Sequence, residues 1–411
     1  LDGPGGAVFL ALRPAIPAVT ARDTMRIFVP TIDYPPIEGG IATVALHLTR
    51  ELARLGHEVT VLAPALRPGN PQYADMADFD AFEPVRVVRF SGYERGWLRV
   101  LPFLNQGFRL AAGADLVLAI NVAYGGLLGL GARLRWRTPY VTFAYAYEFM
   151  KWEFFPARPL FRTVYRCSAT TIAISHFTQS RLAAFGVPRG NTAVVLPGAA
   201  APRPVPDAVQ AGVRARFELG GAKMVLSAGR FIPRKNQVAL VQAWPRVLDR
   251  CPNAHLVLVG RGPTRETCLE KARAFGIEGQ VHCPGYVDDA TLAGLYAACD
   301  VFALPCGQDE GGQVEGFGLV FCEAQAHGKP VVAGRSGGVA DAVRNRETGL
   351  LVDPGNVDAL ADALSRLLND EARAREMGEA GRRRVEEELN WTHFTGGVLE
   401  AAGFAPEAPS P

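Results

Sequence analysis

Two carboxylates around a glycine-rich turn are the residues of this sequence best placed to do chemistry. In the segment EGGQVEGFGLVFCEAQAHGKPVVAG, Glu315 and Glu323 stand eight residues apart, with a glycine on each side of Phe317. The glycines permit a tight loop, so we expect a helix to begin between Phe317 and Leu319. The free backbone N–H groups of such a helix start provide a seat for a diphosphate.

The places of the two carboxylates relative to this helix indicate different roles. Glu323 lies inside the expected helix, where it can accept hydrogen bonds from ribose hydroxyls. Glu315 lies ahead of the helix and can face a reacting sugar. The alternative, from the spacing alone, is a pair of solvent-facing glutamates that flank a glycine turn.

Two cations follow another predicted strand. After KMVLSAGR, the segment FIPRKNQVALVQAW places Arg230 at the strand end and Lys235 just before a helix. Cations at the carboxyl edge of a parallel sheet lie where ligands bind in open α/β folds. They can neutralise the charge that builds on a departing nucleotide diphosphate, and arginine can bind two oxygens at once. The alternative is a set of ion pairs on the surface.

The elements that must position these residues form two successive α/β series. The first begins with the strand MRIFVP, the loop TIDYPPIEGG, the helix IATVALHLTRELARLGH and the strand EVTVLAP, which make a βαβ unit. Near-continuous Val, Leu and Ile runs are typical of parallel strands buried on both faces. The expected strands lie within residues 25–30, 58–64, 85–90, 114–120, 139–145 and 169–175, then 223–230, 254–262, 280–287, 300–305, 329–335 and 348–354.

These series predict two α/β domains, at residues 25–200 and 201–385. The Pro- and Ala-rich stretch LPGAAAPRPVPDAV serves as the linker between them. Residues 386–411 form a terminal helix that returns to the first domain, with Trp391 as its packing anchor, and then a tail. Residues 1–24 are expected to be a disordered extension or tag, because the first clean strand begins at Met25.

Composition limits the class of protein. A length of 411 residues exceeds one ordinary core, and a net charge of only +2 argues against a nucleic-acid partner. The seven cysteines are dispersed without CxxC or metal-ligand spacing, which is typical of reduced thiols in a cytoplasmic protein. No run reaches the roughly 18–20 apolar residues that span a bilayer. The N-terminal stretch lacks the basic start of a secretion signal.

Several of these motifs together resemble a known family. GRFIPRKN and EGFGLVFCE, in that order after PPIEGG and GHEVTVLAP, resemble the family 4 glycosyltransferases. The resemblance runs from Met25 to the terminal helix, and it extends to bacterial mannosyltransferases of the phosphatidylinositol mannoside type. It implies an α/β protein of the GT-B fold, in which two Rossmann-like domains face each other across a cleft. The first domain would take the acceptor and the second the nucleotide sugar.

The resemblance also implies roles for individual residues. Arg230 and Lys235 match the phosphate-binding cations, and Glu323 matches the ribose-binding carboxylate. Glu315 matches the carboxylate that stabilises positive charge at the anomeric carbon of the donor sugar. Other matching positions form the glycine loop of the first domain, the backbone seat of phosphates and sugar, and the end of the base-binding strand: Gly39, Gly40, Gly316, Phe317, Gly318, Leu319 and Val287.

One position departs from the family pattern. Where the family carries His-Gly-x-Glu at the end of a first-domain strand, this sequence has Tyr145-Ala146-Tyr147-Glu148. Tyrosine can donate a hydrogen bond but cannot become a cation. Three interpretations follow: an altered donor or sugar pocket, tolerance of Tyr145 in the same role, or loss of catalysis.

The function implied is retaining transfer of a hexose-type sugar from GDP-mannose or a UDP-sugar to a glycan, lipid-linked or small-molecule acceptor. We expect a front-face mechanism in which the leaving phosphate takes the acceptor proton. We expect no cofactor and no metal, because the DxD-like Asp78-Phe79-Asp80 lies in a polar connection. The alternatives are a catalytically silent nucleotide-sugar binder, or another GT-B enzyme such as a nucleotide-sugar epimerase.

A basic and aromatic segment bears on localisation. FMKWEFFPARPLFRTVYR can lie against an anionic membrane surface, or it can be an amphipathic lid helix with a solvated face. Residues 25–200 carry 18 Lys and Arg against 12 Asp and Glu, so the basic half is the acceptor half. The first interpretation predicts a cytoplasmic protein that is peripheral at the inner membrane face.

Overall fold

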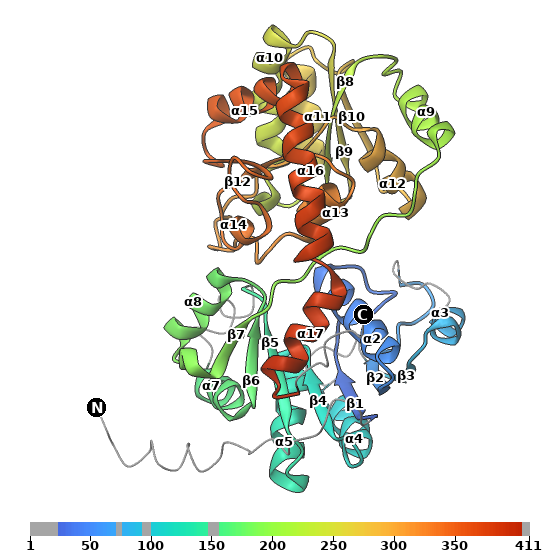
Figure 1. Ribbon diagram of the computed structural model, residues 1–411, viewed down its shortest axis with the longest axis vertical. Coiled ribbons are helices and arrows are strands. Elements are labelled where there is room, and N and C mark those ends of the chain that lie inside the picture. Colours follow the sequence, from blue (N-terminus) through green and yellow to red (C-terminus); the bar gives the residue numbers. More distant parts are fainter. Residues whose placement is uncertain (1–23, 71–75, 93–99, 147–155, 405–411) are drawn as a thin grey trace. The chain divides into compact units, whose positions relative to one another are not determined.

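A computed structural model describes residues 24–70, 76–92, 100–146 and 156–404. The chain divides into two compact units (Figure 1). The N-terminal unit comprises Leu1–Leu196 together with Trp391–Pro411, and the C-terminal unit comprises Pro197–Asn390. Residues 1–23 of the expected extension, and Tyr147 and Glu148 of the motif that departs from the family, lie outside the described residues.

The N-terminal unit is built on a parallel sheet with the strand order β3-β2-β1-β4-β5-β6-β7. Reversal of the order beside β1 creates a switch point between β1 and β4, where loops from the carboxyl ends of both strands diverge. The strands are β1 (Arg26–Pro30), β2 (Glu58–Pro64), β3 (Arg86–Phe90), β4 (Leu116–Ala119), β5 (Tyr140–Ala144), β6 (Thr170–Ala173) and β7 (Thr192–Val194).

The helices of this unit pack on the sheet through a common apolar core. That core joins Phe28 and Val117 of the strands to Phe103, Leu128 and Phe161 of the helices. The helices are α2 (Gly40–Arg54), α3 (Met76–Phe82), α4 (Val100–Ala111), α5 (Leu127–Trp136), α7 (Arg158–Cys167), α8 (His176–Phe185) and α17 (Trp391–Ala401), with a π-helical turn at Val122–Gly126.

Helix α17 packs on α2 and β6, although more than 300 residues separate it from α2 in the sequence. Trp391 stacks on His47 with 4.5 Å between ring centroids and 4° between ring planes. Thr392 donates a hydrogen bond of 3.0 Å to the Glu51 carboxylate. Burial lowers the pKa of His47 to about 4, with a smaller contribution from Arg50.

This stack predicts an acid-sensitive contribution to stability. As the pH falls below about 6.5, the unfolded chain protonates at His47, whereas the folded chain keeps it neutral until about pH 4. The unfolded state therefore binds more protons in this window, and the free energy of unfolding falls by up to about 3 kcal/mol. Thermal unfolding, followed by circular dichroism between about pH 7 and pH 4.5, measures the loss.

The comparison that isolates His47 uses two substitutions. His47→Gln should reduce the pH dependence of the unfolding temperature, and the remaining slope comes from the other histidines whose pKa burial lowers, His57, His255, His282 and His327. His393→Gln, at an exposed position of α17, should follow the wild type. Equal pH slopes for the wild type and His47→Gln would contradict the prediction.

The C-terminal unit repeats the topology with the strand order β10-β9-β8-β11-β12-β13, again parallel. Its switch point lies between β8 and β11, the two central strands. The strands are β8 (Lys223–Ala228), β9 (Ala254–Val259), β10 (Val281–Gly285), β11 (Val301–Leu304), β12 (Val331–Gly334) and β13 (Gly349–Val352).

Helices cover both faces of this sheet. In Figure 1, α9 and α12 lie on one side of it, and α10, α11 and α15 lie on the other, where α10 packs against α11 and α15. The helices are α9 (Asp207–Arg216), α10 (Gln237–Arg250), α11 (Arg265–Ala274), α12 (Asp289–Ala298), α13 (Leu319–Ala326), α14 (Val339–Ala342), α15 (Val357–Asn369) and α16 (Glu371–Glu387).

Both units are the parallel α/β domains predicted from the sequence. Each of the twelve expected strand segments contains a strand, but the short strand β7 was not expected. The Asp78-Phe79-Asp80 segment was predicted to lie in a connection, and it lies in α3 instead, where Asp80 accepts a hydrogen bond of 2.7 Å from Arg89. Within the described ranges, no helix has the length and apolar character needed to cross a bilayer.

Candidate functional site

The switch point of the C-terminal unit brings together the two motifs that the sequence singled out. The loop after β8 carries Arg230 and Lys235, and the loop after β11 leads to α13 with Glu315. The Gly307 N–H donates a hydrogen bond of 2.8 Å to the Arg234 carbonyl, which ties one loop to the other. Loops at the carboxyl ends of these strands form the crevice in which open α/β folds bind ligands.

A buried ion pair lies at the centre of this site. The Lys235 ammonium is 2.8 Å from the Glu315 carboxylate, and the side chains are 11% and 14% exposed. The Arg234 guanidinium lies 4.0 Å from the same carboxylate. The Cys306 thiol, fully buried, is also 4.0 Å from it. Neither Lys235 nor Glu315 therefore belongs to a solvent-facing pair on the surface.

The electrostatics of the pair keep both members charged. Burial opposes the charge on Glu315, but Lys235, with Arg234 and Arg230, outweighs it and holds the pKa of Glu315 below its usual value. Burial likewise opposes the charge on Lys235, and Glu315 outweighs it, so the pKa of Lys235 is raised. The site thus presents an ammonium and a carboxylate that stay ionised near neutral pH.

The backbone of Glu315 is held by a glycine turn after β12. The Gly338 N–H donates a hydrogen bond of 2.8 Å to the Glu315 carbonyl. Gly337 has a φ of +54°, and a Cβ added there would lie 2.1 Å from the same carbonyl oxygen. Only glycine allows the backbone at position 337 to come this close to the Glu315 carbonyl. The turn therefore fixes the position of the Glu315 backbone relative to the sheet.

The start of α13 is open to an anion. Gly318 precedes the helix with a φ of +98°, and a Cβ there would lie 2.5 Å from the Phe321 ring. No side chain caps the helix start at Leu319. Backbone N–H groups and the helix dipole at such an end favour a phosphate. Gly316 and the buried Phe317 lie in the loop that leads to this turn.

Glu323 lies just over one turn into α13 and is held by an aromatic pair. The Tyr296 hydroxyl donates a hydrogen bond of 2.8 Å to its carboxylate. The Tyr296 ring stacks on His327, with centroids 5.3 Å apart. Burial raises the pKa of Glu323, although the hydrogen bond from Tyr296 works against the rise. This arrangement orients one carboxylate oxygen, as a group that binds a ribose diol requires.

Val287 lies past the end of β10, two strands from β8 in the sheet. It is buried, whereas Tyr286 beside it is half exposed. The Arg261 guanidinium lies over the Tyr286 ring, 4.5 Å from its centroid. The stacked Arg261 and Tyr286 side chains offer planar groups of the kind on which a nucleobase can stack.

The remaining predicted residues belong to the N-terminal unit. Gly39 and Gly40 are exposed at the start of α2, which has no side-chain cap. Tyr145 directly follows β5 and is 5% exposed. Both segments follow the carboxyl ends of parallel strands, so they lie at the same edge of the sheet.

Sequence reasoning missed several residues that the structure places in these regions. Arg234 stands directly beside Lys235 in the sequence, and that adjacency was the available signal. Nothing in the sequence singled out Tyr296, because a tyrosine in an apolar helix is expected to be a core residue. Asn121, which lies past β4 at the switch point of the N-terminal unit, was also missed. Its amide nitrogen donates a hydrogen bond of 2.8 Å to the Asp33 carboxylate, and its amide oxygen accepts a hydrogen bond of 3.1 Å from the Thr31 hydroxyl.

The basic aromatic segment is described only from residue 156, where it forms α7. Phe161, Val164 and Tyr165 are buried. Arg162 donates to the Phe185 carbonyl at 3.1 Å, and the Arg158 guanidinium lies 5.4 Å from the Phe185 ring centroid. In the described half, these apolar and basic side chains therefore pack within the unit, whereas Leu160 is exposed.

Comparison with known families covers most of the chain. Residues 39–198 match the family model described as "Glycosyl transferase 4-like domain". Residues 213–384 match that described as "Glycosyl transferases group 1". The first match covers most of the N-terminal unit, and the second lies within the C-terminal unit.

Similar proteins point to sugar transfer. The chain is 34% identical over 379 residues to the GDP-mannose-dependent alpha-(1-6)-phosphatidylinositol monomannoside mannosyltransferase of Mycobacterium tuberculosis, covering 89% of this chain and 95% of that one. It is 30% identical over 392 residues to a D-inositol 3-phosphate glycosyltransferase of Corynebacterium glutamicum, covering 86% and 91% of the two chains.

Solved structures support the fold. The Anabaena protein HepE, in complex with UDP and glucose, superposes with a TM-score of 0.75 at 20% identity, over 92% of this chain and 99% of that one. Sucrose-phosphate synthase from Thermosynechococcus elongatus does so with a TM-score of 0.73 at 24% identity, over 92% and 98%.

Proposed function

Since this chain belongs to the family 4 glycosyltransferases, retaining enzymes of the GT-B fold, we propose that it transfers mannose from GDP-mannose to a mannosylated phosphatidylinositol lipid. The observation that carries the reaction is the buried Lys235–Glu315 pair beside the uncapped start of α13. The choice of donor and acceptor is supported by the mycobacterial relative, a GDP-mannose-dependent mannosyltransferase with 34% identity over most of both chains.

In this proposal the C-terminal unit binds the donor. Lys235 and Arg230 neutralise the diphosphate, and Arg234 adds a third positive charge. The free N–H groups at the start of α13 bind phosphate oxygens, with charge-assisted hydrogen bonds stronger than those between neutral groups. Glu323, oriented by Tyr296, binds the ribose hydroxyls. The loop at Val287 receives the base.

The reacting centre lies next to Glu315. As the bond between the anomeric carbon and the diphosphate oxygen breaks, positive charge develops on the sugar, and the carboxylate stabilises it. The acceptor oxygen forms its bond on the face from which the diphosphate departs. Its proton passes to the departing phosphate oxygen, so no protein nucleophile is needed and the configuration is retained. The cations stabilise the negative charge left on the diphosphate.

The residues of the N-terminal unit that match the family pattern take the roles that the pattern implies. The backbone of Gly39 and Gly40 can approach a phosphate because neither residue carries a Cβ. Tyr145 takes the place of the usual histidine and donates a hydrogen bond to the donor sugar from its hydroxyl. A catalytically silent binder remains the competing function, because that position lacks a group that can become a cation.

The test is a panel of UDP- and GDP-sugars with EDTA present, read by thermal shift and by donor hydrolysis. GDP-mannose should stabilise the protein and be hydrolysed slowly. Vesicles that contain phosphatidylinositol monomannoside should accept labelled mannose and speed turnover. Stabilisation without turnover would favour the silent binder and make Tyr145→His the next variant. A UDP-sugar as the stabilising donor would overturn the proposed donor and leave the reaction class standing.

A further inference from the structure

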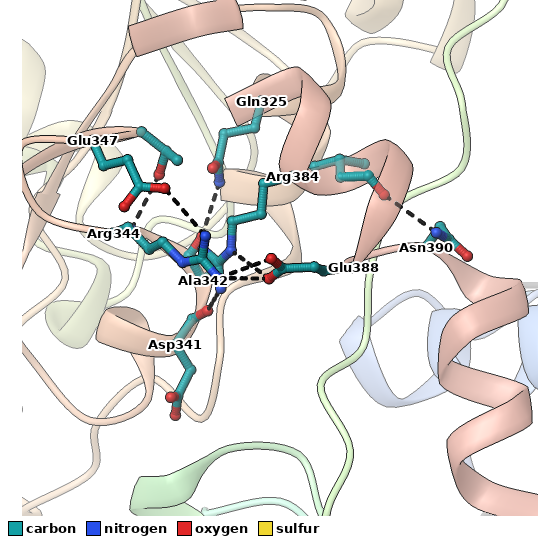
Figure 2. Close-up of polar contacts among 10 residues, drawn as sticks. Gln325, Asp341, Ala342, Arg344, Glu347, Arg384, Glu388 and Asn390 are labelled. Atoms are coloured by element: carbon teal, nitrogen blue, oxygen red, sulfur yellow. Dashed lines mark hydrogen bonds and ion pairs between the residues drawn. The ribbon is translucent and has the colours of Figure 1, made fainter. Parts of the chain in front are cut away.

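The last turn of α16 forms a polar cluster next to the donor site. Figure 2 shows the Arg384 side chain at its centre, with Arg344 approaching from the left, Glu388 from the right and Gln325 from above. The Arg384 side chain is 6% exposed, and each of its three guanidinium nitrogens donates a hydrogen bond. We call Arg384, Glu388 and Arg344 the α16 clamp.

The clamp caps helix α14. Arg384 donates to the carbonyls of Ala342 at 2.9 Å and Asp341 at 2.6 Å, the last two residues of that four-residue helix. Carbonyl groups at a helix end have no partner within the helix, so a buried guanidinium stabilises them through both hydrogen bonds and charge. Without Arg384, both carbonyls would lose this donor, and the Ala342 carbonyl would keep the hydrogen bond from the Gln325 amide.

Glu388 holds the guanidinium in place. Its carboxylate accepts a hydrogen bond of 3.2 Å from Arg384 and bonds of 2.8 and 2.9 Å from Arg344. Burial opposes its charge, but the two arginines hold the pKa of Glu388 below its usual value. The clamp is thus a charged unit with both cations directed at one carboxylate.

Helix α14 connects the clamp to the donor site, because one end contacts Arg384 and the other end contacts the backbone of Glu315. Its cap residue at the other end is Gly338, whose N–H donates to the Glu315 carbonyl at 2.8 Å. Only Val339 and Ala340 lie between Gly338 and Asp341, the first of the two residues whose carbonyls Arg384 caps. A shift of the helix end is therefore transmitted to the backbone of Glu315.

A second contact reaches the helix that binds the ribose. The Gln325 amide donates at 3.0 Å to the Ala342 carbonyl, which Arg384 also caps. Gln325 is fully buried in α13, two residues after Glu323. The Ala342 carbonyl therefore accepts from both Arg384 and Gln325, which ties the end of α14 to α13.

The clamp also lies where the chain leaves the C-terminal unit. Leu389 directly follows Glu388, and its carbonyl accepts a hydrogen bond of 2.9 Å from the N–H of Ala199, which lies at the beginning of the same unit. A Cβ at Gly198 would lie 1.9 Å from that carbonyl oxygen. Both connections to the N-terminal unit are thus anchored beside Glu388.

From these contacts we propose that Arg384 is a positioning residue of the donor site. By capping α14, it holds the glycine turn that fixes Glu315. It touches neither donor nor acceptor, and its effect is to keep the Glu315 carboxylate against Lys235. This inference rests on the proposed role of Glu315 in transfer.

The test compares Arg384→Gln with Arg382→Gln. Arg382 lies on the same helix, half exposed, and pairs only with the exposed Glu386 among the described residues, which makes it a matched control. Both variants are assayed for kcat, for the donor KM and for calorimetric GDP affinity, with the donor that the wild type turns over in the panel. Arg384→Gln should lower kcat at least about tenfold, because a displacement of a reacting group by about 1 Å can cost a hundredfold. GDP affinity should stay within about threefold.

A pH profile distinguishes this from loss of folded protein. The groups around Glu315 are Lys235, Arg234, Arg230 and the Cys306 thiol. If Glu315 moves away from Lys235, its pKa rises, and the acid limb of the kcat profile moves to higher pH in Arg384→Gln. A smaller amount of active protein would scale the profile without moving it.

The outcomes separate this inference from the proposed function. Equal kcat and equal acid limbs in Arg384→Gln and Arg382→Gln would overturn it, as would parallel losses of kcat and GDP affinity. If Arg384→Gln does not fold, Glu388→Gln is measured instead. Glutamine has nearly the same shape as glutamate but carries no charge, so Glu388→Gln weakens the clamp. An unchanged kcat in Glu388→Gln would also overturn the inference. If the wild type turned over no donor, the proposed transferase function itself would be refuted.

Discussion

Replacement of Lys235 by alanine is expected to lower kcat/KM by about two to three orders of magnitude, the loss that follows removal of one preorganised charge-stabilising group. Lys235 lies 2.8 Å from Glu315 in a site with little solvent, where its charge is weakly screened. In the proposed mechanism, the substitution removes a cation that stabilises the departing diphosphate. It also leaves the Glu315 carboxylate buried without its principal partner.

The second effect should appear in stability. Removing one partner of a buried ion pair costs about 3–5 kcal/mol, because the other charge stays desolvated. The pKa of Glu315 should rise at the same time, since Lys235 is the largest influence that lowers it. Thermal unfolding, donor kinetics and GDP calorimetry on the same preparation measure the three quantities.

The control for this substitution is Lys223→Ala. Lys223 lies in the same unit and pairs with Glu371, whose side chain is 68% exposed, so this pair contributes little. Lys223→Ala should therefore leave kcat/KM within about twofold of the wild-type value, as is usual for a surface substitution. If Lys235→Ala retained wild-type kcat/KM, the donor site would have to be placed elsewhere.

Replacement of Glu323 by alanine is expected to weaken donor binding by about 10- to 100-fold, because hydrogen bonds to a charged group contribute about 1.5–3 kcal/mol. Here the loss should appear in KM and in GDP affinity, with little change in kcat. The ribose hydroxyls do not change during transfer, so their contacts are equally strong before and in the transition state.

Two further variants sharpen this prediction. Tyr296→Phe removes only the hydroxyl that orients Glu323, so GDP affinity should fall less, by about three- to tenfold. Asp80→Ala removes the carboxylate that binds Arg89 in the N-terminal unit and should leave donor affinity unchanged. Equal, negligible effects of Glu323→Ala, Lys235→Ala and Asp80→Ala on calorimetric donor affinity would refute this assignment of the site.

The sequence by itself determined the fold class and the order of elements. Runs such as EVTVLAP, bounded by Gly56 and the loop after Pro64, carry enough β-branched and apolar residues to mark a parallel strand, and β2 spans the whole run. Strand β7 was missed because it covers only the first three residues of the short run TAVVL, which leads straight into the Pro- and Ala-rich linker, and these three residues are only partly buried. The residues that we propose for the donor site were also singled out from the sequence, because glycine turns and charges at strand ends follow from local spacing.

Only the tertiary structure decided which of these charges meet. Lys235 and Glu315 are 80 residues apart, and they pair because β8 and β11 are neighbours in a sheet whose order departs from the sequence order. The contacts of Tyr296 with Glu323, and of Arg384 with α14, likewise join separate elements. Local sequence encodes periodicity and turns, whereas burial and pairing of a charge depend on which distant segments exclude water around it.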